Sequence, residues 1–323
     1  MRGCAPGLSS CLTRSRGRRL QAGVLPKAVV LLSAWLLLGC HRSPPHRFPT
    51  AGAALSRLRD TTGCNHAVQG EARLSFSGGG RRLSGRLLYL AHAPTELRFD
   101  IFSPFGATIS TLTSDGRRFS LLDVEQRAFI TGAASACNVQ RFTRVPVPPE
   151  ALVELLRGRP PVLVHEASDA QLDFRSSLFG AGHYRLTVAG KHQARQEIEV
   201  GVVPSDWDLP ADRQRLRLLG VKVEQAGQVL YEVEFSDHRL RHMAPLLQSP
   251  EDDALGLPPP VASGPQCEVE LADRMRVYVP TTGYELTFHS DELWLNPPLQ
   301  DGIFVQRAPA GVTVSESSCG PPS

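Results

Sequence analysis

Apolar and polar residues alternate along much of this chain, and the clearest alternation lies within residues 96–112. Leu97, Phe99 and Ile101 fall on one side of an extended segment, and charged residues stand between them. A period of two predicts a half-buried β-strand. Residues 103–106 then interrupt the pattern with a proline and a glycine, and a second apolar run follows. The segment therefore predicts a β-hairpin.

The predicted hairpin places a large apolar residue in its turn. Pro104 and Gly106 favour the turn, because proline fixes φ and glycine tolerates φ > 0, and Phe105 stands between them. An exposed phenylalanine at such a tip costs hydration free energy, so it generally has a partner or a membrane to contact. Local chemistry leaves two alternatives open: Phe105 is displayed at the tip, or it folds back into the core.

Similar alternation recurs through the rest of the chain, with turn residues between the runs. The pattern predicts a mainly β protein of the α+β class, an open half-barrel of about ten or eleven antiparallel strands. Helices are expected to cover its concave face. Beyond the hairpin, strands are expected at 68–76, 83–90, 119–122, 128–131, 171–174, 182–189, 195–202, 216–225, 229–236, 268–271, 274–279 and 285–288.

Two segments carry helical signals instead. Residues 145–158 have prolines near their start and a glycine at their end, which are common at helix termini. Leu152, Leu155 and Leu156 lie on the apolar face of this predicted helix. A shorter helix is expected after Thr50, whose side chain is suited to capping it.

The N-terminal residues 1–39 read as a signal peptide. Basic residues precede an apolar run at 28–38, which is short for a membrane span and has the length of a signal-peptide core. The run ends Leu-Leu-Gly-Cys40, which resembles the bacterial lipobox, whose cysteine is acylated (palmitate is the expected chain). An ordinary signal peptide or a short anchor is the alternative. His41 in place of an aspartate favours the outer membrane, where the protein would be lipid-anchored on the periplasmic face.

Loss of residues 1–39 changes the charge of the chain. They hold six of the 35 Lys and Arg and none of the 32 Asp and Glu, so 29 basic residues face 32 acidic ones and the net charge falls from +3 to −3. No basic aromatic patch is present either, so nucleic-acid binding is not expected. The mature chain is expected to have a flexible tether at 40–49 and a single domain at 50–323, with a mobile, acidic, proline-rich loop at 248–266.

Four cysteines remain beside the acylated Cys40: Cys64, Cys137, Cys267 and Cys319. An even number in an oxidising compartment predicts two disulfides. Three pairings are possible, and we favour the one that joins the first cysteine to the second and the third to the fourth, because each bridge then bounds one block of the chain. A zinc site is the alternative, but no pair has the C-x-x-C spacing common in such sites.

Catalytic signatures are missing from the sequence. It contains no nucleophile elbow, no H-E-x-x-H, no Walker loop and no dinucleotide-binding fingerprint. We interpret the acidic group around His165 as a polar loop rather than an acid–base pair, and the turn around Trp207 as a packed indole rather than a sugar platform. No enzymatic activity, metal or cofactor is therefore expected. A curved apolar sheet that needs helices to cover it favours a pocket for an apolar ligand.

Two segments resemble LolB, the family of outer-membrane lipoproteins that receive other lipoproteins. Residues 101–109 are similar to that family's strand–Asn-Pro-Leu-Gly–strand hairpin, and residues 146–158 to its proline-rich start, helix and Leu-Gly end. The tail from Asn296 to Val312 looks more like the related periplasmic carrier LolA. The resemblance is clear over residues 68–161 and weaker beyond them.

The resemblance implies an open, half-closed β-barrel capped by helices, with an apolar cavity that holds acyl chains. It also implies that Phe105, in the place of the family's hairpin-tip leucine, contacts the membrane and aids lipoprotein insertion, with Pro104 and Gly106 beside it. The residues expected to line the cavity are Leu74, Phe76, Leu97, Phe99, Ile101, Leu152, Leu155 and Leu156.

The expected function is that of an outer-membrane lipoprotein that binds acyl chains and receives or inserts lipoproteins or related lipids. Its expected partners are the membrane, the acyl chains of lipoproteins or lipids, and a periplasmic LolA-like carrier, and the protein is expected to be a monomer. A structural or envelope-assembly lipoprotein of the same fold, without transport activity, is the alternative.

The lipobox predicts that Cys40 anchors the chain. Cys40→Ala removes the only thiol that this signal can acylate, so the variant should leave the membrane fraction while the folded domain survives. Cell fractionation with detection of the protein checks this. A variant that stays in the membrane fraction like the wild type would contradict the lipoprotein assignment.

Overall fold

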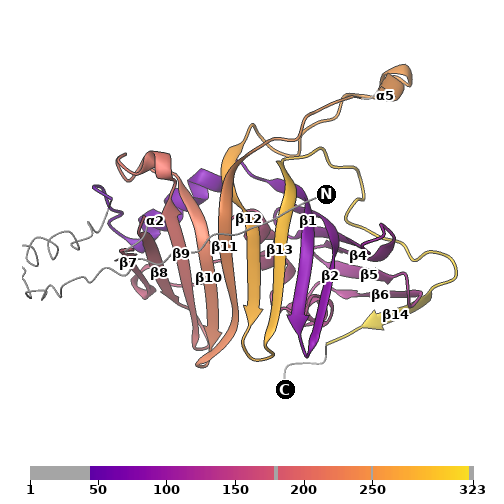
Figure 1. The fold of residues 1–323 in the computed structure, drawn as a ribbon, viewed down its shortest axis with the longest axis horizontal. Coiled ribbons are helices and arrows are strands. Elements are labelled where there is room, and N and C mark those ends of the chain that lie inside the picture. The colour runs from indigo at the N-terminus through magenta and orange to yellow at the C-terminus, as the bar shows by residue number, and fades with distance from the viewer. Residues whose placement is uncertain (1–43, 178–180, 249, 320–323) are drawn as a thin grey trace, which may run out of the picture. The chain divides into compact units, whose positions relative to one another are not determined.

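The computed structural model describes residues 44–177, 181–248 and 250–319, and strands dominate this part of the chain (Figure 1). Fourteen strands form one sheet, in the order β14-β6-β5-β4-β3-β2-β1-β13-β12-β11-β10-β9-β8-β7. Neighbouring strands are antiparallel except β14 and β6, which run parallel. Since the two ends of this order do not pair with each other, the sheet is open.

The strands are β1 (Ala67–Gly78), β2 (Arg81–His92), β3 (Glu96–Phe102), β4 (Thr108–Asp115), β5 (Arg118–Asp123), β6 (Ala128–Ala133), β7 (Ala170–Arg175), β8 (His183–Ala189), β9 (Ala194–Val202), β10 (Leu216–Gln225), β11 (Gln228–His242), β12 (Glu268–Val279), β13 (Tyr284–Leu295) and β14 (Thr313–Ser317). The helices are α2 (Ala51–Thr62), α3 (Ala136–Thr143), α4 (Pro149–Leu156) and α5 (Pro250–Ala254), with 3₁₀ turns at Ala167–Asp169 and Pro204–Asp206.

The open, mainly β fold is confirmed. The expected number of strands, ten or eleven, was too low, because the sheet has 14. Most side chains of β14 are exposed, so no apolar alternation marks that strand in the sequence. The strands expected at 268–271 and 274–279 are one strand, β12. Asp273 interrupts its apolar pattern, yet it takes an inward position, where it is buried and paired with Arg239 at 2.9 Å and with Arg241.

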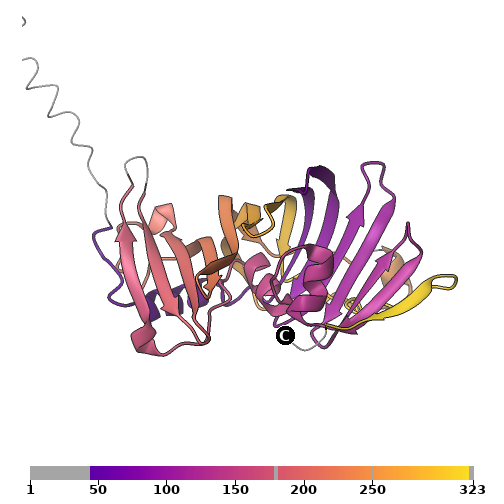
Figure 2. The same cartoon turned by 90° about the horizontal axis from the view of Figure 1, so that it is seen from below.

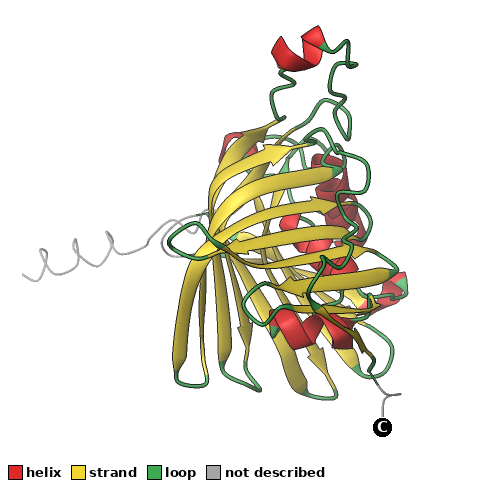
Figure 3. Ribbon diagram, turned by 90° about the vertical axis from the view of Figure 1, so that its right-hand side faces the viewer, coloured by secondary structure: helices red, strands yellow, loops and turns green. Residues whose placement is uncertain are grey.

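The sheet consists of two meanders joined by one pairing between distant segments. Strands β1–β6 follow one another in space, and so do β7–β13, whereas β1 and β13 pair across almost the whole domain, with Val68 opposite Leu295. The sheet curves, and helices lie against its inner side (Figures 2 and 3). Helix α4 contacts β2 and β3, and α2 contacts β7 and β10, so each meander has its own helical cover.

Helix α2 forms where the sequence predicts it. The Thr50 side chain accepts a hydrogen bond from the backbone N–H of Ala53 at 3.1 Å and caps the first turn. Ala54, Leu55 and Leu58 are buried against the sheet. The acidic segment at 248–266 is not a plain loop, because it contains the short helix α5, and it extends away from the sheet in Figure 1.

The cysteines pair differently from our expectation. The disulfides are Cys64–Cys267 and Cys137–Cys319, with Cα–Cα distances of 5.2 and 6.2 Å. The expectation that a bridge bounds a block of the chain was wrong because sheet order, not sequence order, sets which segments meet. β13 lies between β1 and β12, so Cys64 before β1 meets Cys267 before β12. The parallel pairing of β14 with β6 brings the C-terminal segment to α3.

A buried asparagine next to the first disulfide joins the two halves of the sheet. Asn296 is fully buried, and its side-chain oxygen accepts hydrogen bonds from the backbone amides of His66 (2.9 Å) and Ala67 (3.1 Å). Its side-chain amide donates to the carbonyl oxygens of Cys64 (2.9 Å) and Pro265 (2.8 Å). One side chain therefore satisfies four backbone groups, which belong to the start of β1 and to the segments before β1 and β12.

Asn296→Gly tests this junction without adding backbone strain. The residue has φ +46°, which glycine adopts readily, so the change removes only the side chain. Each lost hydrogen bond costs about 0.5–1.5 kcal/mol, and more where the group left unpaired is buried, as the Ala67 amide is. With four hydrogen bonds lost, the free energy of unfolding should fall by about 3 kcal/mol. Chemical denaturation measures it. Ala226→Gly, at an exposed turn residue with φ +50°, is the control and should lose nothing. Equal stability of the two variants would show that the junction is dispensable.

Candidate functional site

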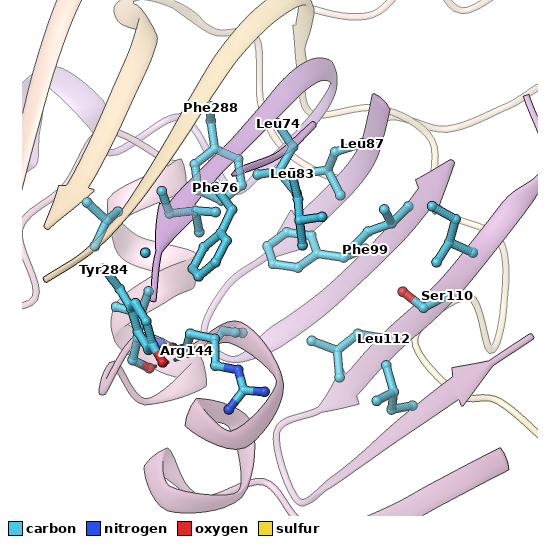
Figure 4. Close-up of a pocket in the computed structure, with 18 of the residues that line it drawn as sticks. Leu74, Phe76, Leu83, Leu87, Phe99, Ser110, Leu112, Arg144, Tyr284 and Phe288 are labelled. Carbon is cyan, nitrogen blue, oxygen red and sulfur yellow. Dashed lines mark hydrogen bonds between the residues drawn. The ribbon is translucent and has the colours of Figure 1, made fainter. Parts of the chain in front are cut away.

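An apolar cavity of about 810 Å³ lies on the inner side of the first meander (Figure 4). Strands β1 to β6 supply most of its wall, β12 and β13 close one side, and the α3–α4 region forms the facing wall. Leu, Ile, Val and Phe dominate the lining. Beside the residues discussed below, the lining includes Leu83, Leu87, Ile109, Ser110, Leu112, Leu121, Ile130, Val145, Val147, Val277, Leu286 and Phe288.

Most of the residues expected to line a cavity do line this one. They are Leu74, Phe76, Phe99, Ile101, Leu152 and Leu155. Leu97 does not: it lies near the start of β3, opposite Ala91 and Ser114, and it is fully buried. Leu156 points to the other side of α4, where it lines a second pocket of about 30 Å³ against β11 to β13. The apolar residues of β3 and α4 therefore have two roles. Some of them line the cavity, whereas Leu97 and Leu156 pack elsewhere in the domain.

Helix α4 is held in place at its C-terminal end by a buried arginine. The Arg157 guanidinium is almost fully buried, bonds the carbonyl oxygen of Asn65, and pairs with Glu154 at 2.6 Å. The Asn65 side chain returns a hydrogen bond to the Arg157 carbonyl oxygen at 3.0 Å. Burial lowers the pKa of Arg157 from its usual value, although the Glu154 carboxylate opposes this. The residues that α4 contributes to the cavity are therefore fixed relative to β1.

Helix α3 is fixed to the edge of the sheet. Ser135 caps it by accepting from the Asn138 backbone amide at 3.3 Å, and Cys137 in its first turn is bonded to Cys319 beyond β14. The Asn138 side chain donates to the Ala133 carbonyl oxygen at 2.9 Å and accepts from the Ser317 hydroxyl at 3.1 Å. The second helical wall is thus tied to both β6 and β14.

Phe105 lies at an exposed hairpin tip, 97% exposed, so the alternative in which it folds into the core is wrong. The turn is well bonded: the Ser103 carbonyl oxygen accepts from the Gly106 amide at 2.9 Å, and the Ser103 hydroxyl accepts from the Ala107 amide at 3.1 Å. Gly106 has φ +84°, the conformation that glycine favours, and Pro104 precedes the tip. The tip is therefore displayed by a defined turn.

Two residues with shifted pKa values, Tyr89 and His238, lie outside the cavity lining. Tyr89 shares a hydrogen bond with Ser290 at 3.1 Å, and burial raises the pKa of Tyr89 to about 12. Burial also lowers the pKa of His238, which bonds the Leu218 carbonyl oxygen at 2.8 Å. Neither residue lines the cavity. Among the described residues, no group of three or more His, Cys, Asp or Glu is placed to hold a metal ion.

The two segments considered for other chemistry have structural roles. His165 bonds the Leu163 carbonyl oxygen at 2.7 Å within a loop. The Trp207 ring is buried, so it offers no face to a sugar. Next to it, Asp206 accepts hydrogen bonds from the Arg215 side chain at 2.7 and 2.8 Å, and that guanidinium lowers the pKa of Asp206 to about 2.

Cys40 and residues 1–39 lie outside the described residues. Within the described ranges, none of the helices has the length and apolar character needed to cross a bilayer. Sequence reasoning missed α3, an eight-residue helix in which Val139 is buried. A helix of about two turns gives too short a stretch for a helical period to stand out from the strands around it. Sequence reasoning also missed Arg144, which ends α3 and lines the cavity. Ser135, a good N-cap residue, is a sequence signal for the start of this helix.

Comparisons with known proteins find solved structures at low sequence identity. No family model matches the sequence, and no curated protein matches it. A DUF1329 family protein from Desulfovibrio piger is 14% identical, over 79% of this chain and 95% of that one, with a TM-score of 0.48. A LolA superfamily protein from Nitrosomonas europaea is 14% identical, over 80% and 99%, with a TM-score of 0.44. A lipoprotein-sorting protein domain of the outer membrane from Vibrio parahaemolyticus is 10% identical, over 79% and 95%, with a TM-score of 0.45.

Proposed function

We propose that this chain is an outer-membrane lipoprotein that binds acyl chains in its cavity and receives or inserts lipoproteins, or related lipids, at that membrane. The observation that carries the proposal is the apolar cavity of about 810 Å³, which side chains leave unfilled between β1–β6 and α4. A lipoprotein with a purely structural role needs no such volume, and voids of this size are costly in a folded core. The size and the apolar lining are those of a ligand pocket.

The energetics of an acyl chain explain why such a pocket is needed. Each methylene transferred out of water contributes roughly 0.8 kcal/mol, so a free chain between two membranes faces a high barrier. A protein cavity that replaces water with Leu, Ile and Phe lowers that barrier without an energy source. The direction of transfer then follows from the relative affinities of donor, cavity and membrane.

In this proposal the exposed Phe105 ring enters the bilayer interface. Burial of its ring at a bilayer interface would contribute roughly 1.5–3 kcal/mol, too little to hold a protein at a membrane. A chain already tethered through Cys40 needs only orientation, which this amount supplies. The hairpin tip would then bring the released lipid to the bilayer.

A bulky side chain in the cavity tests ligand binding. Ser110 lines the cavity, so Ser110→Phe should weaken binding of a fluorescent long-chain fatty acid by about tenfold or more, equivalent to excluding about two methylenes. Ser84 on β2 lies on the opposite face from the lining residue Leu83, and Ser84→Phe is the matched control that should bind like the wild type. Fluorescence titration and thermal melting of each protein provide the readouts. Unchanged binding by Ser110→Phe would place the acyl chain elsewhere, and lack of binding by the wild type would refute the proposal.

Charge at the hairpin tip tests membrane delivery. Phe105→Glu should change the free energy of unfolding by no more than about 0.5 kcal/mol, because the side chain is exposed. It should slow transfer of a bound fluorescent lipid from the protein to phospholipid vesicles by about tenfold, whereas Phe105→Leu should transfer normally. Stability is measured by denaturation and transfer by dequenching. If Phe105→Glu transfers at the wild-type rate, the tip has no part in delivery.

A further inference from the structure

The cavity reaches solvent at one end of the sheet. Antiparallel neighbours place the turns after β1, β3, β5 and β12 at the same end, and the cavity lining includes residues from or beside each of these turns. Leu83, Arg81 and Arg144 line the cavity and are also exposed, so the cavity opens there. We call this end the mouth. The Phe105 tip belongs to the same set of turns.

Basic side chains lie at the mouth. Arg81 and Arg144 are the cations among the lining residues. Within the described part of the chain, neither guanidinium forms an ion pair or a side-chain hydrogen bond, whereas Arg98 pairs with Asp100 at 2.7 Å. The exposure of both arginines leaves their donors available.

Tyr284 lies at the turn that leads to Arg81 and lines the same cavity as both arginines. It lies against the β1–β2 turn, where a Cβ added to Gly78 would meet the Tyr284 ring at 2.1 Å, and its ring lies 5.4 Å from that of Phe76. Figure 4 shows Tyr284 and Arg144 on the same side of the cavity. Arg81 follows that turn directly, at the start of β2. The cationic groups therefore border the same side of an apolar space.

The acidic group of the lining lies away from the two arginines, so an anion is favoured on the side of the arginines. Asp123 lies across the sheet on β5 and uses one carboxylate oxygen to accept the Gln126 amide at 2.9 Å. Its negative charge disfavours an anion near β5. Glu125 in the same turn adds a second negative charge, and Arg127 adds a positive one. The basic side of the mouth is thus the side of Arg81 and Arg144.

We propose that Arg81 and Arg144 bind the anionic headgroup, a phosphate or carboxylate, of a lipid whose acyl chain occupies the cavity. Planar guanidinium groups match the oxygens of both anions and form charge-assisted hydrogen bonds with them. An apolar interior next to a cationic mouth also fixes the orientation of an amphiphile, with its chain inward and its headgroup outward. This inference rests on the proposed function and specifies the ligand: an anionic lipid binds in preference to a neutral one with the same chain.

Two lipids that share a palmitoyl chain test the headgroup. Lysophosphatidylglycerol and monopalmitoylglycerol are each titrated, below their critical micelle concentrations, against the wild type and against the double variant Arg81→Gln/Arg144→Gln. The wild type should bind the anionic lipid about tenfold or more tightly than the neutral one, as expected for hydrogen bonds to charged groups. The double variant should lose this preference and keep its affinity for the neutral lipid. Arg82→Gln, one residue along β2 and outside the cavity lining, is the matched control and should keep the preference.

The outcomes separate this inference from the proposed function. Equal affinity of the wild type for the two lipids, or an undiminished preference in the double variant, overturns the headgroup site while acyl binding stands. Loss of binding to both lipids by the double variant also overturns it, because the arginines would then act on the cavity as a whole. Failure of the wild type to bind either lipid refutes the proposed function itself. Inorganic phosphate in excess should compete only weakly; full competition would assign the site to free phosphate instead.

Discussion

The pairing of β1 with β13 is the constraint on which the rest of this structure depends. Each meander is built from neighbours in sequence, but the two become one sheet only where the start of the domain meets a strand more than two hundred residues later. Loop closure over such a distance costs conformational entropy, and the junction concentrates strong interactions to offset it. The buried Asn296 side chain hydrogen-bonds four backbone groups there, and the Cys64–Cys267 disulfide lies beside it.

The cavity follows from curvature of an open sheet combined with short helices. The concave face of the first meander is wider than α3 and α4 can fill, so apolar side chains line a space instead of packing together. Both helices are tied to the sheet, α4 by Arg157 and α3 by the Cys137–Cys319 disulfide. These ties keep the helical wall from collapsing onto the strands, which preserves an apolar volume that packing forces would otherwise close.

The mouth of the cavity combines three features that would serve the proposed binding of a lipid and its transfer to a membrane. The interior is apolar, Arg81 and Arg144 present cationic donors at the opening, and Phe105 stands at a turn of the same end of the sheet. Antiparallel connectivity produces this arrangement, because alternate turns of a meander lie at one end. A lipid that leaves the cavity headgroup first would therefore emerge on the side where the hairpin tip is displayed.

The sequence alone determined the local elements and the character of the cavity wall. A period of two marked most strands, Thr50 marked the start of α2, and Pro104 and Gly106 marked the hairpin turn, because these features depend on neighbouring residues. The structure then decided that Phe105 is exposed at the tip of that turn. Only the tertiary structure decided which segments meet. Sheet order set the disulfide partners, separated Leu97 from the cavity, and brought Arg144 to the mouth. Contacts between segments far apart in sequence depend on strand order and sheet curvature, and local periodicity carries no information about either.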